Sequence, residues 1–84
     1  MNSINEIVEN IKTDLYLVKS TLPKTINEED HLSKSGLESL DMIELIARIE
    51  YRYQIPIEDV DWKKLHSINL IADYIFKKLN KEYA

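Results

Sequence analysis

The chain has 84 residues, which is enough for one compact domain and not two. Its 15 acidic side chains outnumber its 11 Lys and Arg, and the resulting net charge of −4 disfavours nucleic acid, whose phosphates reward clustered cations. The absence of cysteine excludes disulfide frameworks, Cys-based metal sites and Cys nucleophiles.

No segment has the pattern of a signal peptide, and no apolar run approaches the ~20 residues needed to span a bilayer. We therefore expect a cytoplasmic monomer that binds neither a membrane nor nucleic acid. One Gly and two Pro are too few for a β-sandwich or barrel with many tight turns, so the composition favours helices.

The first predicted helix begins with a capping box, in which the Ser3 hydroxyl accepts the Glu6 amide and Glu6 reaches back to Ser3. Pro23 is its predicted stop. Between them, apolar residues recur at helical spacing over about five turns, at Ile4, Ile7, Val8, Ile11, Leu15, Val18 and Leu22.

A long polar connection follows over residues 23–38, and Leu32 and Leu37 are expected to pin it to the core. Further helices are predicted from Ser39 to Tyr53, from Glu58 to Lys64 after the break at Pro56, and from the N-cap Ser67 to about Lys81. The prediction is an all-α fold: a small four-helix bundle of three main helices and one short helix, forming a single domain over residues 1–84.

The second predicted helix has more apolar surface than one buried face requires. On a helical wheel one arc carries Met42, Leu45, Ile46, Ile49 and Tyr53, and the opposite side carries Asp41, Glu44, Arg48 and Arg52. A second apolar strip consists of Leu40, Ile43, Ala47 and Tyr51, and Glu50 sits between the two strips. Because charges are rarely fully buried, Glu50 suggests that this second strip faces solvent as a docking surface. The alternative is a helix that is simply more buried.

The run from Gly36 to Leu45, Gly-Leu-Glu-Ser-Leu-Asp-Met-Ile-Glu-Leu, resembles the acyl carrier protein signature, Gly-x-Asp-Ser-Leu followed by an acidic, apolar helix. The likeness continues without a gap to Ile75, and the first helix and the long loop match the family's architecture. Ser39 alone is weak evidence, since serine at a helix start is usually a cap. The whole run with its spacing is more specific.

The resemblance implies that Ser39 is the attachment site of a covalent 4'-phosphopantetheine arm, transferred from coenzyme A by a magnesium-dependent phosphopantetheinyl transferase. The arm would carry acyl or aminoacyl groups as thioesters to loading and synthase enzymes of fatty acid, polyketide or nonribosomal peptide biosynthesis, so the chain itself is not an enzyme. A helix N-terminus favours the attached phosphodiester. Residue-by-residue matching assigns partner binding to Glu38, Leu40, Asp41, Ile43, Glu44, Ala47, Arg48, Glu50 and Tyr51.

Three departures from the family pattern stand out. Glu38 replaces the usual Asp before the serine, and its longer side chain is a poorer cap. This chain has Arg48, Tyr51 and Arg52 at positions where carriers of bulk fatty acid synthesis tend to be acidic. The difference points to a dedicated partner, in a specialised pathway. Glu58 occupies the usual proline position, because Pro56 comes early, and this leaves the entry to the third helix in doubt.

Other readings have less support. His31 and His66 are interpreted as isolated loop residues, not metal ligands, and an enzyme using Asp30, His31 or Glu44 lacks a nucleophile motif. A carrier-like interaction protein that is never modified remains the main alternative. Trp62, Val60 and Leu65 are expected to cover the core. A further group serves either as core or as the wall of a cavity for the carried chain, with core favoured: Leu45, Ile49, Tyr53, Ile57, Leu65 and Ile71.

Overall fold

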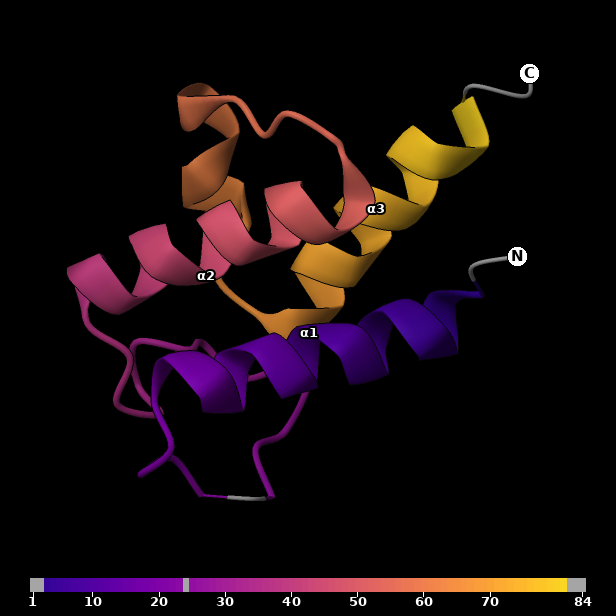
Figure 1. Ribbon diagram of the computed structural model, residues 1–84. Coiled ribbons are helices and arrows are strands. Elements are labelled where there is room, and N and C mark those ends of the chain that lie inside the picture. Colours follow the sequence, from indigo (N-terminus) through magenta and orange to yellow (C-terminus); the bar gives the residue numbers. More distant parts are fainter. Residues whose placement is uncertain (1–2, 24, 82–84) are drawn as a thin grey trace.

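The computed structural model describes residues 3–23 and 25–81. Its elements are α1 (Ile4–Val18), α2 (Ser39–Tyr53), the 3-10 helix η1 (Asp59–Lys64) and α3 (Ile68–Lys81). Figure 1 shows α1 and α2 running side by side in opposite directions, with α3 crossing behind them and the long loop joining α1 to α2 at one end. The described ranges contain helices and no strand, which confirms the all-α bundle of three main helices and a short one.

The ends of α1 differ from the prediction in two details. The Glu6 amide donates to the Ser3 hydroxyl at 3.2 Å as predicted, but the Glu6 carboxylate accepts from that same hydroxyl at 3.3 Å, not from the Ser3 amide. The helix ends at Val18, one turn before the predicted stop at Pro23, because Lys19 turns to an extended conformation. Leu22 is nevertheless buried, since the chain folds back and carries it into the core.

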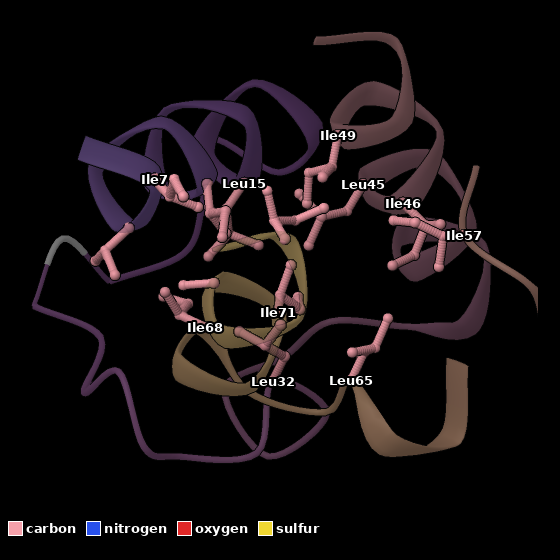
Figure 2. Close-up of a cluster of buried hydrophobic side chains, with 14 of the residues drawn as sticks. Ile7, Leu15, Leu32, Leu45, Ile46, Ile49, Ile57, Leu65, Ile68 and Ile71 are labelled. Carbon is pink, nitrogen blue, oxygen red and sulfur yellow. The ribbon is translucent and has the colours of Figure 1, made fainter. Parts of the chain in front are cut away.

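The core fills the space between the three long helices. Figure 2 shows side chains of α1, α2 and α3 pointing into one interior, joined by Leu32 from the long loop and by Ile57 and Leu65 from either side of η1. Leu37 is also buried, so both leucines of the loop pin it to the core as predicted. The candidates for core or cavity wall are core residues, except that Tyr53 is half-buried at the edge, where its hydroxyl accepts from Asn10 at 2.9 Å.

Charged side chains join α1 to its surroundings. Arg52 of α2 makes two hydrogen bonds to the buried Asp14 of α1, at 2.8 and 2.9 Å. Lys12 Nζ lies 2.7 Å from a carboxylate oxygen of Glu28 in the loop. Arg52, which the wheel placed opposite the core arc, stays partly exposed there while its guanidinium reaches across to α1.

The short helix η1 is tied to α3 by the Tyr74 hydroxyl, which donates to Asp61 at 3.0 Å. Trp62 packs against the core and its indole N–H donates to the Ile57 carbonyl at 3.3 Å. Val60, expected to help cover the core, is instead 79% exposed. Ser67 caps α3 as predicted, because its hydroxyl accepts the Leu70 amide at 3.2 Å. None of the helices in the described part of the chain combines the length and apolar character needed to cross a bilayer.

Candidate functional site

Ser39 is the first residue of α2 and its side chain is exposed. Glu38, the N-cap, is extended, and its carbonyl accepts the first helical hydrogen bond from the Met42 amide at 3.0 Å. The amides of the first turn lack partners within the helix, and they leave a partial positive charge there. The Ser39 hydroxyl is therefore accessible at a site that favours an anionic substituent.

The turn before Ser39 is built on a glycine and two buried leucines. Gly36 has a φ of +112°, a conformation that residues with a side chain rarely adopt. The Leu37 amide donates to the Leu32 carbonyl at 3.1 Å, and both leucine side chains are buried. The loop is thus anchored to the core just before it reaches the serine, which holds Ser39 at the surface.

Asp41 and Lys19 form a charged contact at this helix start. One carboxylate oxygen of Asp41 accepts the Glu38 amide at 2.9 Å and also the ammonium of Lys19 at 3.3 Å. The Glu38 amide, and after it Lys19, stabilise the ionised carboxylate and hold the pKa of Asp41 below its ordinary value. Sequence patterns gave no signal for Lys19, because it follows α1 and meets its partner only in the folded chain.

The second strip is exposed, as the docking interpretation requires. Leu40 is 78% exposed, Ile43 is 47% exposed and Tyr51 is 81% exposed, and Ala47 between them also lies at the surface. The alternative of a helix buried on both sides is wrong. An apolar strip with an aromatic residue at its end has the composition of a protein-binding surface.

The residues beside the second strip differ in what they already contact. Glu44 and Arg48 are exposed and form an ion pair at 3.3 Å. Glu50, however, is half-buried, and its carboxylate accepts the Ile57 amide at 2.8 Å. The strip is exposed as predicted, but the reason given for it was wrong: Glu50 does not mark a solvated edge, because its side chain holds the α2–η1 connection in place.

Arg52 also has a structural partner. Its guanidinium spans both carboxylate oxygens of Asp14, and this hydrogen bonding raises the pKa of Arg52. A shallow groove of about 590 Å³ between α1 and α2 has this pair in its wall, together with the exposed Leu17. Of the residues that depart from the acidic family pattern, Arg52 is held by α1, whereas Arg48 pairs with Glu44 on its own helix.

The histidines are not isolated. The rings of His31 and His66 stack with their centroids 3.8 Å apart, so they connect the long loop to the start of α3. Within the described ranges, no group of three or more His, Asp or Glu is placed to hold a metal ion. Two of the residues considered for an enzyme are engaged with different partners. Glu44 accepts a hydrogen bond from Arg48, and the ring of His31 stacks on that of His66.

The arrangement fits a covalent phosphopantetheine group. The attachment needs a hydroxyl that a second protein can reach, and the phosphodiester it creates is stabilised by the helix N-terminus. Ser39 meets both conditions. When bound, the group would supply a thiol on a long flexible arm, chemistry that a chain without cysteine cannot otherwise provide.

Comparison with known proteins agrees with this geometry. The model of a family described as "Phosphopantetheine attachment site" matches residues 5–75. The acyl carrier protein of Buchnera aphidicola subsp. Schizaphis graminum is 32% identical over 81 residues, covering 96% of this chain and 100% of that protein. The one from the Acyrthosiphon pisum subspecies, strain Tuc7, is 30% identical over 78 residues, covering 93% and 95%. The mitochondrial acyl carrier protein of Neurospora crassa is 37% identical over 57 residues, covering 67% of this chain and 42% of that protein.

The family match runs from α1 into α3 and includes the exposed serine at the start of α2. The first of these relatives is matched over its whole length. Proteins of this kind are carriers and not enzymes, and their domain is defined by the attachment of phosphopantetheine. The chain therefore belongs to the acyl carrier protein family.

Proposed function

We propose that Ser39 bears the 4'-phosphopantetheine arm, and that the chain carries acyl or aminoacyl thioesters on it to enzymes of fatty acid, polyketide or nonribosomal peptide biosynthesis. The observation that carries this proposal is the exposed hydroxyl at the first position of α2, inside the segment matched by the attachment-site family. The anchored turn before Ser39 and the cap after it support the same assignment.

The loading step is a phosphoryl transfer to the hydroxyl by a phosphopantetheinyl transferase. A bond forms between Ser39 Oγ and the phosphorus that carries the pantetheine of coenzyme A, while the diphosphate bond breaks and adenosine 3',5'-bisphosphate leaves. The hydroxyl proton passes to a base on the transferase. The contribution of this chain is to present the hydroxyl outside the core and to place the new negative charge at a helix N-terminus.

Intact-mass measurement tests the attachment site. The chain is incubated with coenzyme A, Mg²⁺ and a broad-specificity phosphopantetheinyl transferase, and we expect the mass of one arm to be gained. Ser39→Ala should abolish the gain, whereas Ser33→Ala, at an exposed loop position, should leave it intact. A wild-type chain that stays unmodified would contradict the proposal and favour an interaction protein that uses the same surface without an arm.

We further propose that partner enzymes dock on the second strip and its neighbours. The strip offers Leu40, Ile43, Ala47 and Tyr51, and the flanking positions are Glu38, Asp41, Glu44, Arg48 and Glu50. Asp41 and Glu50 already hold backbone amides, so they would contribute charge to the surface more than new hydrogen bonds. The exposed apolar side chains and the Glu44–Arg48 pair are expected to make the direct contacts.

The transferase itself provides a measurable partner for this surface. The few side chains that dominate an interface cost more than about 1 kcal/mol when truncated, and Leu40, next to Ser39 and 78% exposed, is the candidate for that role on the strip. Leu40→Ala should therefore raise the KM for this chain at least about fivefold. Ile4→Ala removes a side chain at the first position of α1 that is 38% exposed, and should leave that KM unchanged. Equal KM values for the two variants would exclude the strip as the docking surface for the transferase.

The basic and aromatic character at the end of the strip supports a dedicated partner in a specialised pathway. Arg48 and Tyr51 are both exposed there, and Arg48 sits one turn from an acidic residue, Glu44. A partner with only a basic surface would be repelled by Arg48. Loading assays that compare Arg48→Glu with wild type would test this, because a bulk fatty acid synthase should accept the variant better than wild type.

A further inference from the structure

Lys19 connects the end of α1 to the segment that contains Ser39. Its Nζ donates to the Gly36 carbonyl at 2.7 Å and to the Asp41 carboxylate at 3.3 Å. The same carboxylate oxygen accepts the Glu38 amide at 2.9 Å. A single ammonium group thus holds the backbone three residues before Ser39 and the side chain two residues after it.

These contacts lie where they can restrain the segment. The side chains of Lys19 and Asp41 are only 29% and 24% exposed, so water screens their attraction less than in a fully exposed pair. The Gly36 carbonyl that Lys19 holds belongs to the residue with a φ of +112°. The N-terminal side of the segment is fixed by this bond, and the C-terminal side by Asp41 within the first turn of α2.

We propose that Lys19 is a positioning residue for the modification of Ser39: it holds residues 36–41 in the conformation that presents the hydroxyl to the phosphopantetheinyl transferase. The inference rests on the proposed attachment at Ser39. Without Lys19, the segment populates that conformation for a smaller fraction of the time, and the apparent affinity of the transferase falls by that fraction. The bound complex still contains the competent conformation, so the rate at saturation is retained.

Lys19 also has an electrostatic effect at this position. The transfer brings the phosphates of coenzyme A towards a helix start that already carries Glu38 and Asp41. The ammonium of Lys19, bonded directly to Asp41, offsets part of that negative charge. Removing the charge and the hydrogen bonds of Lys19 should therefore weaken binding of the transferase to this chain. The rate of the chemical step in the bound complex should not change.

Lys12 provides a matched control. It lies on α1, its side chain is also 29% exposed, and its ammonium contacts Glu28 at 2.7 Å, near the middle of the same loop. Lys12→Met therefore removes a comparable tie between α1 and the loop without touching residues 36–41. Lys19→Arg keeps a cation and hydrogen-bond donors at the position.

The first experiment measures transferase kinetics with coenzyme A and the chain as substrates, at a temperature where circular dichroism shows every variant folded. Lys19→Met should raise the KM for the chain about tenfold, the equivalent of ~1.4 kcal/mol, with kcat within about twofold of wild type. Lys12→Met should leave both constants unchanged, and Lys19→Arg should recover most of the KM. Unchanged kinetics in Lys19→Met, or an equal rise in Lys12→Met, would overturn the inference.

The second experiment does not depend on the transferase. Hydrogen exchange and amide chemical shifts of residues 37–41 should change in Lys19→Met and remain as in wild type in Lys12→Met. If Lys19→Met leaves these amides unchanged, Lys19 does not position the segment, whether or not Ser39 is modified. If the amides change but wild type never gains the arm, the attachment proposal fails while the restraint by Lys19 stands.

Discussion

At the scale of single residues, Ser39 contributes only a hydroxyl, and its neighbours decide whether that hydroxyl can react. Gly36 allows the turn that leads to it, Leu37 anchors that turn in the core, and Asp41 accepts the amide that precedes it. The Ser39 side chain is exposed and does not contribute to the core. Ser39→Ala is therefore expected to remove the modification and leave the structure intact.

Gly36 makes a conformational demand that can be measured. A Cβ at this position would meet Leu22 at 3.5 Å, an ordinary contact, so space is available and only the φ of +112° is unfavourable. We expect Gly36→Ala to lower the free energy of unfolding by about 1–3 kcal/mol, the cost of holding a residue with a side chain in that region. Urea unfolding measures the loss. Ser33→Ala, at an exposed position of the same loop, is the control and should change stability by less than about 0.5 kcal/mol.

At the scale of helices, the Asp14–Arg52 pair joins α1 to α2. Asp14 is buried with a side chain only 5% exposed, and both of its oxygens accept from Arg52. Arg52→Met leaves that carboxylate buried without its partner, and should lower the free energy of unfolding by about 2 kcal/mol. Thermal and urea unfolding both report this change.

The Glu44–Arg48 pair on the same helix serves as the control. Its two side chains are 53% and 42% exposed, and pairs in such surroundings contribute at most about 1 kcal/mol. Arg48→Met should therefore destabilise much less than Arg52→Met. Equal effects would mean that the Asp14–Arg52 pair does not hold the helices together.

The contact between η1 and α3 should respond to alkaline pH. Burial, followed by the hydrogen bond to Asp61, raises the pKa of Tyr74 above its ordinary value of about 10. Because the folded state binds this proton more tightly than the unfolded state, the stabilisation is complete below pH 10 and is lost as the pH rises through the higher pKa of the folded protein. Tyrosinate absorbance should show a late-titrating fraction that disappears in Tyr74→Phe.

The boundaries of α2 and α3 could be predicted from sequence, because helical periodicity and caps are local signals. The exposed strip on α2 was visible for the same reason. What could not be predicted depends on residues brought together by folding. Lys19 meets Gly36 and Asp41 across the α1–α2 connection, and the two histidines stack over a separation of 35 positions.

The end of α1 and the role of Glu50 show the same limit. Leu22 continues the apolar spacing of α1, but it is buried from a turn outside the helix, and no periodicity can distinguish these cases. Glu50 was expected to mark a solvated edge, yet its carboxylate holds the Ile57 amide. A wheel shows which residues share a face of one helix, and it cannot show which distant backbone group a side chain will bind.

At the scale of the whole molecule, α2 has to support the core on one face and remain exposed on another. A domain of this size buries only about 60% of its chain surface, so few residues are available for the core. Ile49 is fully buried, whereas Leu40 on the same helix is 78% exposed. Stability and the proposed docking therefore depend on different residues of α2, and single substitutions should separate them.

Truncation of these two side chains tests that separation. Ile49→Ala should lower the free energy of unfolding by about 2–5 kcal/mol, because it removes buried methyl groups and leaves a cavity. That loss is a large share of the ~5–15 kcal/mol that stabilises a typical domain. Leu40→Ala should change stability by less than about 0.5 kcal/mol while weakening transfer of the arm. Urea midpoints at a constant slope measure the first effect and transferase KM the second. A Leu40→Ala variant that unfolds as readily as Ile49→Ala would show that the strip belongs to the core.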